Sequence, residues 1–434
     1  MSNKKTIYFH IGTHKTGTTA LQKYFVTNRE ILKEKNIHYD WYHEIEHNQG
    51  FLINQDSWDT ITFDCNKNYL ISSEDFYHKI LQISDTVKEK LNCFNIKFII
   101  YFKRQDLMKQ SVYNQIVKGS DFYKSIQEDN HYNYDYYGFL KQLEKHFPSA
   151  GIVVKAYEKE QFKDGSIFAD FFDILDLELT DEYKIEKGVV NPSLTRDKLE
   201  IVRYINQLDL PMILKKNIKG LIVKSEIDTN NVSIFREQNL LSPDESKQFL
   251  ESYKNGNRLI AKEYLNREDE NLFYETIENN KEWKPYEGLT KEVAIHILQS
   301  IHKINQDVIN QLINFIINKN TRTKVFVEAT NFIMPLLIQI TNKNIKFSPY
   351  KVDEMKVNNS GIFMSIKTEL GSNFESADIL REVAFTFEQT GDIETAYKIM
   401  KQAHALRQEG PVIEQKFEEY KKILREKRKE KELS

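Results

Sequence analysis

The sequence predicts an α/β fold in which helices flank a parallel sheet and a helical region follows. Three observations support this prediction. Short apolar runs alternate with segments of helical periodicity, a pattern typical of a parallel sheet covered on both faces. A loop rich in glycine and threonine joins the first strand to the first helix. From about Leu194 onward the pattern is mainly helical.

Four apolar runs have the length and flanking residues of buried strands: Thr6–Ile11, Tyr69–Ser72, Ile96–Phe102 and Gly151–Ala156. After the first of them, apolar residues recur at helical spacing from Ala20 to Phe25. A longer helix is predicted over Asp106–Lys118, with Gly119 as its stop. The first strand, the loop and the first helix therefore form one unit.

The helical region has its own signals. Ser242 and Pro243 predict the start of a helix, with the serine as its cap. Apolar residues from Ile297 to Ile316 form one stripe of a long helix, and the polar stretch 351–373 is expected to be a connector. We therefore expect three parts, which are residues 1–285, 286–372 and 373–434.

Near the end of the chain, eight residues fall at the spacings of a tetratricopeptide repeat: Leu380, Val383, Ala384, Phe387, Gly391, Ala396, Met400 and Ala403. One copy is present, or one and a fraction, whereas about three are needed for an independent array. A helical hairpin docked on the main domain is therefore favoured, with binding of a protein partner as the alternative. The charge run from Lys421 to Ser434 predicts a solvated, frayed helix end.

Composition excludes several classes of protein. The chain has 434 residues, 40% of them apolar, and a net charge of −3, whereas a nucleic-acid binder usually carries a basic excess. Cys65 and Cys93 are the only cysteines, which argues against a disulfide framework and a structural zinc site. Neither a signal peptide nor an apolar run of about 18 residues is present, so we expect a cytoplasmic protein without a transmembrane segment.

The loop after the first strand has the features of a phosphate site. A helix that begins directly after a strand and a loop points its free amides, and the positive end of its dipole, at the loop. Gly12 and Gly17 permit the backbone conformations that such a loop needs. Lys15, Thr18 and Thr19 add a charge and two hydroxyl groups. The predicted sheet is therefore of P-loop type.

The loop departs from a Walker A motif, which requires lysine directly after the second glycine and then a hydroxyl for magnesium. Here Thr18 follows Gly17, and Lys15 precedes that glycine by two positions. The third predicted strand ends in Lys103 and Arg104 rather than in an aspartate that could bind magnesium. We therefore expect an anion that reacts without a metal.

The run His14-Lys15-Thr16-Gly17-Thr18-Thr19 resembles the 5′-phosphosulfate loop of sulfotransferases that use PAPS (3′-phosphoadenosine-5′-phosphosulfate). It is most similar to a bacterial branch of that family, whose loops read HKTGTT or PKTGTT. The stretch from Ile99 to Tyr113 is similar to the family's 3′-phosphate site, in which a basic residue ends a strand and a serine lies in the next helix. The resemblance covers about residues 5 to 275.

This resemblance implies that the loop, from His14 to Thr19, contacts the donor nucleotide. Ser111 is expected to hold the 3′-phosphate together with Lys103 or Arg104. Family members usually have arginine where Lys103 stands. Arg104 is slightly favoured, because arginine offers phosphate a bidentate fork whereas lysine acts as a point charge.

The resemblance also implies transfer of a sulfuryl group to a hydroxyl, with 3′,5′-adenosine bisphosphate as the product. A capsular or surface glycan is the favoured acceptor, and an aryl, lipid or peptide hydroxyl is the alternative. Lys15 is expected to stabilise charge on the leaving phosphate. The acceptor hydroxyl needs a base within hydrogen-bond reach. Glu74, at the end of a buried strand, and His47 are the two candidates. His47 lies in a loop with the weaker candidates His43, Glu44 and Glu46.

Two other functions remain open. An atypical P-loop kinase or NTPase is the enzyme alternative, although the chain lacks the Walker A lysine. A non-catalytic assembly protein, with a degenerate nucleotide site and the helical tail as a scaffold, is the second alternative. The presence of both Lys15 and Ser111 argues against such a degenerate site.

Overall fold

The computed structural model describes residues 4–13, 15–40, 49, 61–185, 193–225, 240–277, 283–319, 323–350, 376–389, 392–407 and 410–433. The chain divides into two compact units. The first takes residues 1–319 and 328–349, and the second takes residues 320–327 and 350–434. The polar stretch 351–373, expected to be a connector, lies outside the described residues.

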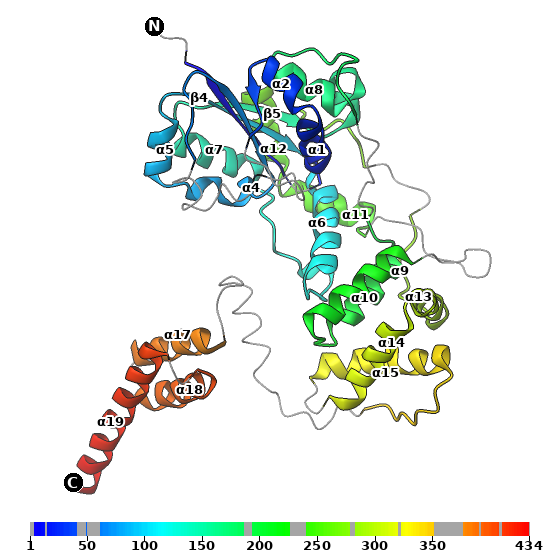
Figure 1. Ribbon diagram of the computed structural model, residues 1–434, viewed down its shortest axis with the longest axis vertical. Helices are drawn as coiled ribbons and strands as arrows, with labels where there is room; N and C mark the ends of the chain where they lie inside the picture. The colour runs from blue at the N-terminus through cyan, green and yellow to red at the C-terminus, as the bar shows by residue number, and fades with distance from the viewer. Residues whose placement is uncertain are drawn as a thin grey trace. The chain divides into compact units, whose positions relative to one another are not determined.

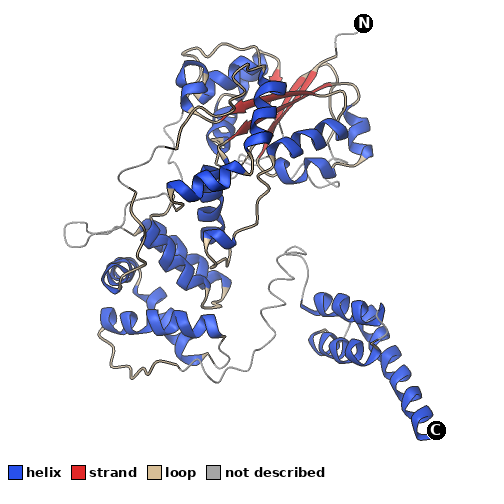
Figure 2. Cartoon of the chain, turned by 180° about the vertical axis from the view of Figure 1, so that it is seen from behind, coloured by secondary structure: helices blue, strands red, loops and turns tan. Residues whose placement is uncertain are grey.

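A parallel sheet forms the centre of the first unit, which confirms the predicted α/β class (Figure 2). Within the described residues it has five strands in the order β2-β3-β1-β4-β5. Their bounds are β1 Thr6–Ile11, β2 Ile37–His38, β3 Asn68–Ser73, β4 Asn95–Phe102 and β5 Gly151–Ala156. Four of them match the predicted runs to within one residue. The two-residue β2 is too short to leave an apolar pattern.

Alternate residues of the strands enter two separate cores, because successive side chains of a strand point to opposite faces. Phe9 and Phe98 pack with α4 Phe76–Lys79, α5 Asp85–Leu91, α7 Tyr136–His146 and α12 Lys254–Leu265 on one face (Figure 1). Tyr8 and Tyr101 pack with α1 Thr18–Thr27, α2 Arg29–Glu34 and α8 Ile167–Ile174 on the other. Both faces of the sheet are therefore covered.

The remaining helices of the first unit follow the sheet. Their bounds are α6 Gln105–Gly119, α9 Arg196–Asn206, α10 Met212–Lys224, α11 Pro243–Glu251, α13 Lys291–Ile304 and α14 Gln306–Asn318. Helix α15, Lys324–Thr341, includes residues of both units. Short 3-10 turns lie at Ile80–Gln82, Ile126–Glu128, Lys159–Gln161 and Lys163–Gly165. Helices α13 and α14 pack on α10, so helices on both sides of the predicted boundary at residue 285 belong to one unit.

Two local predictions for the helical region have different outcomes. The start of α11 is confirmed, since Ser242 Oγ accepts the Glu245 amide at 3.1 Å and the Glu245 carboxylate accepts the Ser242 amide at 2.7 Å. The single long helix through Ile297 and Ile316 is wrong. Asn305 leaves helical geometry (φ −153°) and its side chain accepts the Val308 amide, which starts α14. Both α13 and α14 bury apolar residues at helical spacing, so the periodicity of the sequence does not reveal where one helix ends and the next begins.

The two cysteines form a single disulfide with each other, which the argument against a disulfide framework had not anticipated. Cys65 lies shortly before β3 and Cys93 shortly before β4. These strands flank β1 in the sheet, so the amino ends of the two strands are close in space. The Cα atoms are 5.9 Å apart although 28 positions separate the residues in sequence. Pairing of this kind depends on strand order, which cysteine spacing does not reveal.

The second unit contains the predicted hairpin, formed by α17 Ser376–Gln389 and α18 Ile393–Leu406. A further helix, α19 Pro411–Leu433, packs on α18. The shared core includes Ala384, Ala396, Met400, Ala403 and Tyr420, mostly from the predicted repeat positions. The charged tail, expected to be a frayed end, is helical as far as Leu433. Docking of the hairpin on the rest of the chain stays a prediction.

None of the helices that the structure describes combines the length and the apolar character needed to cross a bilayer.

The Cys65–Cys93 bond should contribute about 3 kcal/mol to the free energy of unfolding, because it closes a loop of 28 residues in the unfolded chain. We expect a reductant to lower the melting temperature of the wild-type chain. A chain with both Cys65→Ser and Cys93→Ser should melt at that lower temperature with or without reductant. Scanning calorimetry measures both values, and a wild-type chain insensitive to reductant would contradict the bond.

Candidate functional site at the carboxyl end of the sheet

Three strand ends bring the predicted site residues to one edge of the sheet. β1 pairs in parallel with β3 and with β4, so their carboxyl ends lie together. The loop 12–17 follows β1, Glu74 follows β3, and Lys103 and Arg104 follow β4. In open α/β sheets, ligands bind outside the carboxyl ends of the strands.

The loop leaves the first amides of α1 without partners in the helix. Gly17 takes the N-cap position in the left-handed conformation (φ 73°), and no side chain caps the helix. Thr13 Oγ1 donates to the Tyr101 carbonyl at 2.7 Å, and Thr16 Oγ1 donates to the Thr13 carbonyl at 2.7 Å. Thr13 therefore ties the loop to β4 and Thr16 bridges two residues of the loop itself, with the helix amides available to an anion.

Glu74 lies directly beside the start of this loop. The Gly12 amide donates to the Ser73 carbonyl at 3.0 Å. A Cβ atom on Gly12 would come within 3.2 Å of the Glu74 Cα and within 2.6 Å of the Thr18 side chain. Only glycine fits this position. Glu74 is half-buried, so its carboxylate is a candidate proton acceptor next to the loop.

Lys103 and Ser111 face each other across the start of α6. Lys103 Nζ donates to Ser111 Oγ at 3.0 Å, and Ser111 Oγ donates to the Leu107 carbonyl at 2.7 Å. Burial lowers the pKa of Lys103, and the charge of Lys15 lowers it further. Burial and the charge of Lys15 also lower the pKa of Lys118, at the other end of α6.

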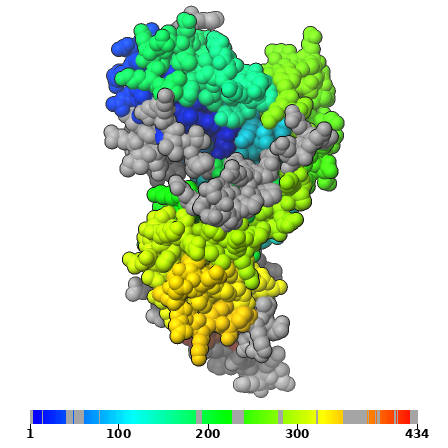
Figure 3. All heavy atoms as spheres, turned by 90° about the vertical axis from the view of Figure 1, so that its right-hand side faces the viewer, coloured from blue at the N-terminus to red at the C-terminus, as the bar shows by residue number. Residues whose placement is uncertain are grey.

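The charge of Lys15 in the loop therefore acts on a lysine at each end of α6. Figure 3 shows atoms of the N-terminal segment (dark blue) next to cyan atoms, the colour of α6. Like charges that approach in this way raise the electrostatic free energy unless an anion lies between them. The arrangement is suited to bind an anion of more than one charge.

Arg104, which the sequence slightly favoured for the 3′-phosphate, is already engaged. Its Nε and Nη2 donate to the two carboxylate oxygens of Asp106 at 2.8 and 3.0 Å. Its Nη1 donates to the Glu275 carbonyl at 2.6 Å. The guanidinium is buried in these contacts. The geometry thus favours Lys103, the residue that contacts Ser111, as the phosphate ligand.

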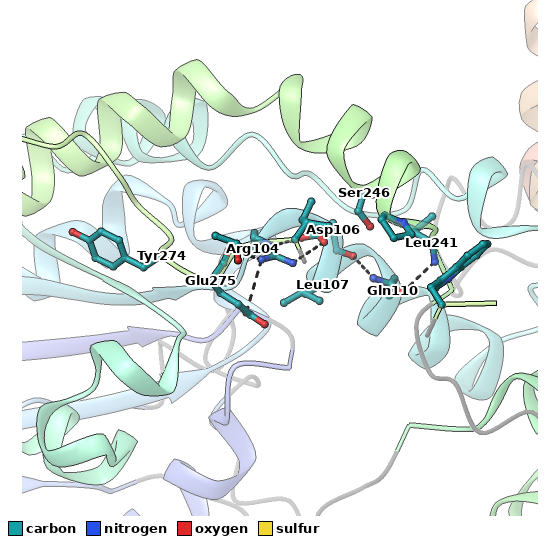
Figure 4. A pocket seen from close by; sticks show the side chains of 12 residues that line it. Arg104, Asp106, Leu107, Gln110, Leu241, Ser246, Tyr274 and Glu275 are labelled. Atoms are coloured by element: carbon teal, nitrogen blue, oxygen red, sulfur yellow. Dashed lines mark hydrogen bonds and ion pairs between the residues drawn. The ribbon is translucent and has the colours of Figure 1, made fainter. Parts of the chain in front are cut away.

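A cavity of about 560 Å³ opens on the Arg104 side of α6 (Figure 4). Its lining combines the first turns of α6, the start of α11 and the segment 274–277. The lining residues are Arg104, Asp106, Leu107, Gln110, Leu241, Pro243, Ser246, Tyr274, Glu275, Thr276, Ile277 and Trp283. Sequence reasoning missed this cavity, because its walls come from segments more than 130 positions apart.

Several predicted residues cannot be placed. His14, His47 and the weaker candidates His43, Glu44 and Glu46 lie outside the described residues. Of the loop residues, Thr16 and Thr18 are buried, whereas Thr19 is exposed at the start of α1. Over the described part of the chain, no three His, Cys, Asp or Glu side chains gather in a group that could hold a metal ion.

His10 is a titratable residue near the site that the sequence did not single out. It lies in β1 and is fully buried, with Nδ1 2.8 Å from Ser72 Oγ. Burial lowers the pKa of His10 to about 3, so the ring is neutral at pH 7. It lies within the core between the sheet and α8, away from solvent, which makes it a structural residue rather than a base.

Comparison with known proteins yields one informative match. A protein of Archaeoglobus fulgidus, described as uncharacterized, is 32% identical over 200 residues. The match covers 45% of this chain and 53% of the archaeal protein, so the chain spans about half the length of that relative. No family model and no solved structure matches the chain. The functional argument therefore depends on the site itself.

Lys103→Met should weaken binding of 3′,5′-adenosine bisphosphate by roughly tenfold or more, because a hydrogen bond to a charged group is lost. Binding of ADP, which has no 3′-phosphate, should change little. Lys97→Met is the matched control, since Lys97 lies at the other end of β4 over the Tyr8 ring. Isothermal titration compares the three proteins. An unchanged bisphosphate affinity in Lys103→Met would exclude the proposed pair.

Proposed function

We propose that this protein transfers a sulfuryl group from PAPS to a hydroxyl group, with a carbohydrate as the acceptor class. The observation that carries the proposal is that two groups of residues suited to bind anions lie at one edge of the sheet. One is the α1 amino end with Lys15, and the other is the Lys103–Ser111 pair. PAPS carries a phosphosulfate at its 5′ position and a phosphate at its 3′ position, so it needs two such sites.

The residues suggest how the transfer would proceed. The acceptor oxygen attacks sulfur, the bond from sulfur to the phosphate oxygen breaks, and 3′,5′-adenosine bisphosphate leaves. Negative charge develops on the leaving phosphate, where Lys15 and the amides of α1 would stabilise it. The proton of the acceptor hydroxyl passes to a base. Glu74 is supported in that role because it lies beside the loop.

The cavity beside α6 supports a nucleotide as the ligand. Its volume of about 560 Å³ lies within the range of small-molecule sites, roughly 300 to 1,000 Å³. It adjoins the Lys103–Ser111 pair through Leu107, whose carbonyl accepts the Ser111 hydroxyl. A nucleoside attached to a phosphate on that pair would find room there.

Three further points stay predictions. A cytoplasmic location stays an expectation from the sequence, and the Cys65–Cys93 disulfide counts against it because such bonds are rare in reducing compartments. A protein partner for the C-terminal helices is supported by the separate core of α17, α18 and α19. The kinase alternative differs from our proposal in its need for magnesium, which bridges phosphates in phosphoryl transfer.

Transfer of label from PAPS to candidate glycans should persist in excess EDTA, since lysines and helix amides would supply the stabilising charge. Lys15→Ala should stay folded but lose roughly a hundredfold in turnover, as for a lost electrostatic donor. Radiolabel transfer measures both. Activity that disappears with EDTA, returns with magnesium and uses ATP would establish the kinase alternative instead.

Glu74→Gln and His47→Ala separate the two candidate bases. The true base should lose turnover by roughly a hundredfold or more while the affinity for 3′,5′-adenosine bisphosphate is retained. We expect this result for Glu74→Gln. The two variants are compared by transfer rate and by titration with the bisphosphate. Near-normal rates in both would exclude both residues and favour Glu44 or Glu46.

A further inference from the structure

Glu275 lines the cavity next to Arg104, the neighbour of Lys103, and its backbone is held at two points. Its amide donates to Glu158 Oε1 at 3.1 Å, and its carbonyl accepts from Arg104 Nη1 at 2.6 Å. The neighbouring Tyr274 amide donates to Glu158 Oε2 at 2.9 Å. Glu158 is buried, so it is a fixed anchor for this segment.

The Glu275 carboxylate remains accessible while its backbone is fixed. Its Oε2 lies 4.0 Å from Arg104 Nη1, and the side chain is 55% exposed. Figure 4 shows it beside Arg104 at the edge of the cavity. Its negative charge acts on Lys103 and raises the pKa of that lysine, against the larger effect of burial. A carboxylate is therefore held next to the proposed 3′-phosphate site.

A carboxylate beside a phosphate site repels the phosphate and weakens its binding. Another interaction between that carboxylate and the ligand would offset the loss of affinity. An ionised carboxylate only accepts hydrogen bonds, and its natural ligand is a hydroxyl or amino donor. Asp106, the other carboxylate of the cavity lining, has both oxygens bound to Arg104. Gln110 Oε1 accepts the amides of Leu240 and Leu241. Glu275 is thus the carboxylate of this lining with acceptor capacity for a ligand.

The ribose of a 3′-phosphorylated nucleotide offers such a donor. Its 2′-hydroxyl is on the carbon next to the one that carries the phosphate. If the phosphate binds Lys103 and Ser111 and the nucleoside enters the cavity, this hydroxyl would lie where the phosphate site meets the cavity. That border is where Glu275 presents its carboxylate.

We propose that Glu275 accepts a hydrogen bond from the ribose 2′-hydroxyl and so selects 3′-phosphorylated ribonucleotides over their 2′-phosphorylated isomers. The inference rests on the proposed function, because it places the 3′-phosphate on Lys103 and Ser111. A 2′-phosphate would bring like charge against Glu275. A 2′-deoxy nucleotide would offer Glu275 no donor and lose the hydrogen bond.

Isothermal titration with three ligands tests the inference: adenosine 3′,5′-bisphosphate, adenosine 2′,5′-bisphosphate and 2′-deoxyadenosine 3′,5′-bisphosphate. We expect the wild type to bind the first roughly tenfold or more tightly than either of the others. Glu275→Gln should bind the 2′,5′ isomer more tightly than the wild type does, since it removes the repulsion. Glu275→Ala should bind the ribose and deoxyribose 3′,5′ ligands equally.

Glu268→Gln is the matched control, because it removes an exposed carboxylate outside the cavity lining with the same change in net charge as Glu275→Gln. It should keep the wild-type preferences. Equal binding of all three ligands by the wild type would overturn the inference and leave the proposed function standing. Wild-type preferences retained in both Glu275 variants would also overturn it. A wild type that binds none of the three would overturn the proposed function and this inference together.

Discussion

β1 pairs in parallel with β3 on one side and β4 on the other, and the site depends on this pairing. The carboxyl ends of neighbouring parallel strands lie at the same edge of the sheet, so the segments that follow these strands lie close together. Here those segments carry the glycine loop, Glu74 and Lys103. The loop is tied to β4 by the Thr13 hydroxyl on the Tyr101 carbonyl, which makes its position a property of the sheet.

Tyr101, whose carbonyl accepts the Thr13 hydroxyl, is itself held in place by its side chain. The Tyr101 hydroxyl donates to Asp170 Oδ2 at 2.7 Å, and Lys155 Nζ donates to Asp170 Oδ1 at 3.0 Å. Asp170 is buried in α8, so β4, β5 and α8 share one polar network behind the loop. A buried carboxylate is tolerated when it is paired and hydrogen-bonded, as this one is. The network holds the sheet rigid where the loop needs support.

Lys103 and Arg104 are neighbours in sequence, but their side chains have different electrostatic surroundings. Arg104 is satisfied by Asp106 and the Glu275 carbonyl, so it stabilises the start of α6. Lys103 lies in the field of Lys15, and its ammonium group donates to the Ser111 hydroxyl. Repulsion between the positive charges of Lys15 and Lys103 destabilises the ligand-free fold. Unfavourable interactions of this kind are expected where a protein binds a ligand. Arg104, which the sequence favoured as the phosphate ligand, is therefore less suited to that role than Lys103.

The sequence by itself determined the elements that local patterns encode. Apolar runs located β1 and β5 to the residue, and Ser242 with Glu245 marked the start of α11, because strand burial and helix capping depend on neighbouring residues. The glycine loop was visible for the same reason. Tertiary structure alone decided the Cys65–Cys93 bond and the engagement of Arg104 by Glu275. These features join segments 28 and 171 positions apart, and only strand order and helix packing bring such segments together.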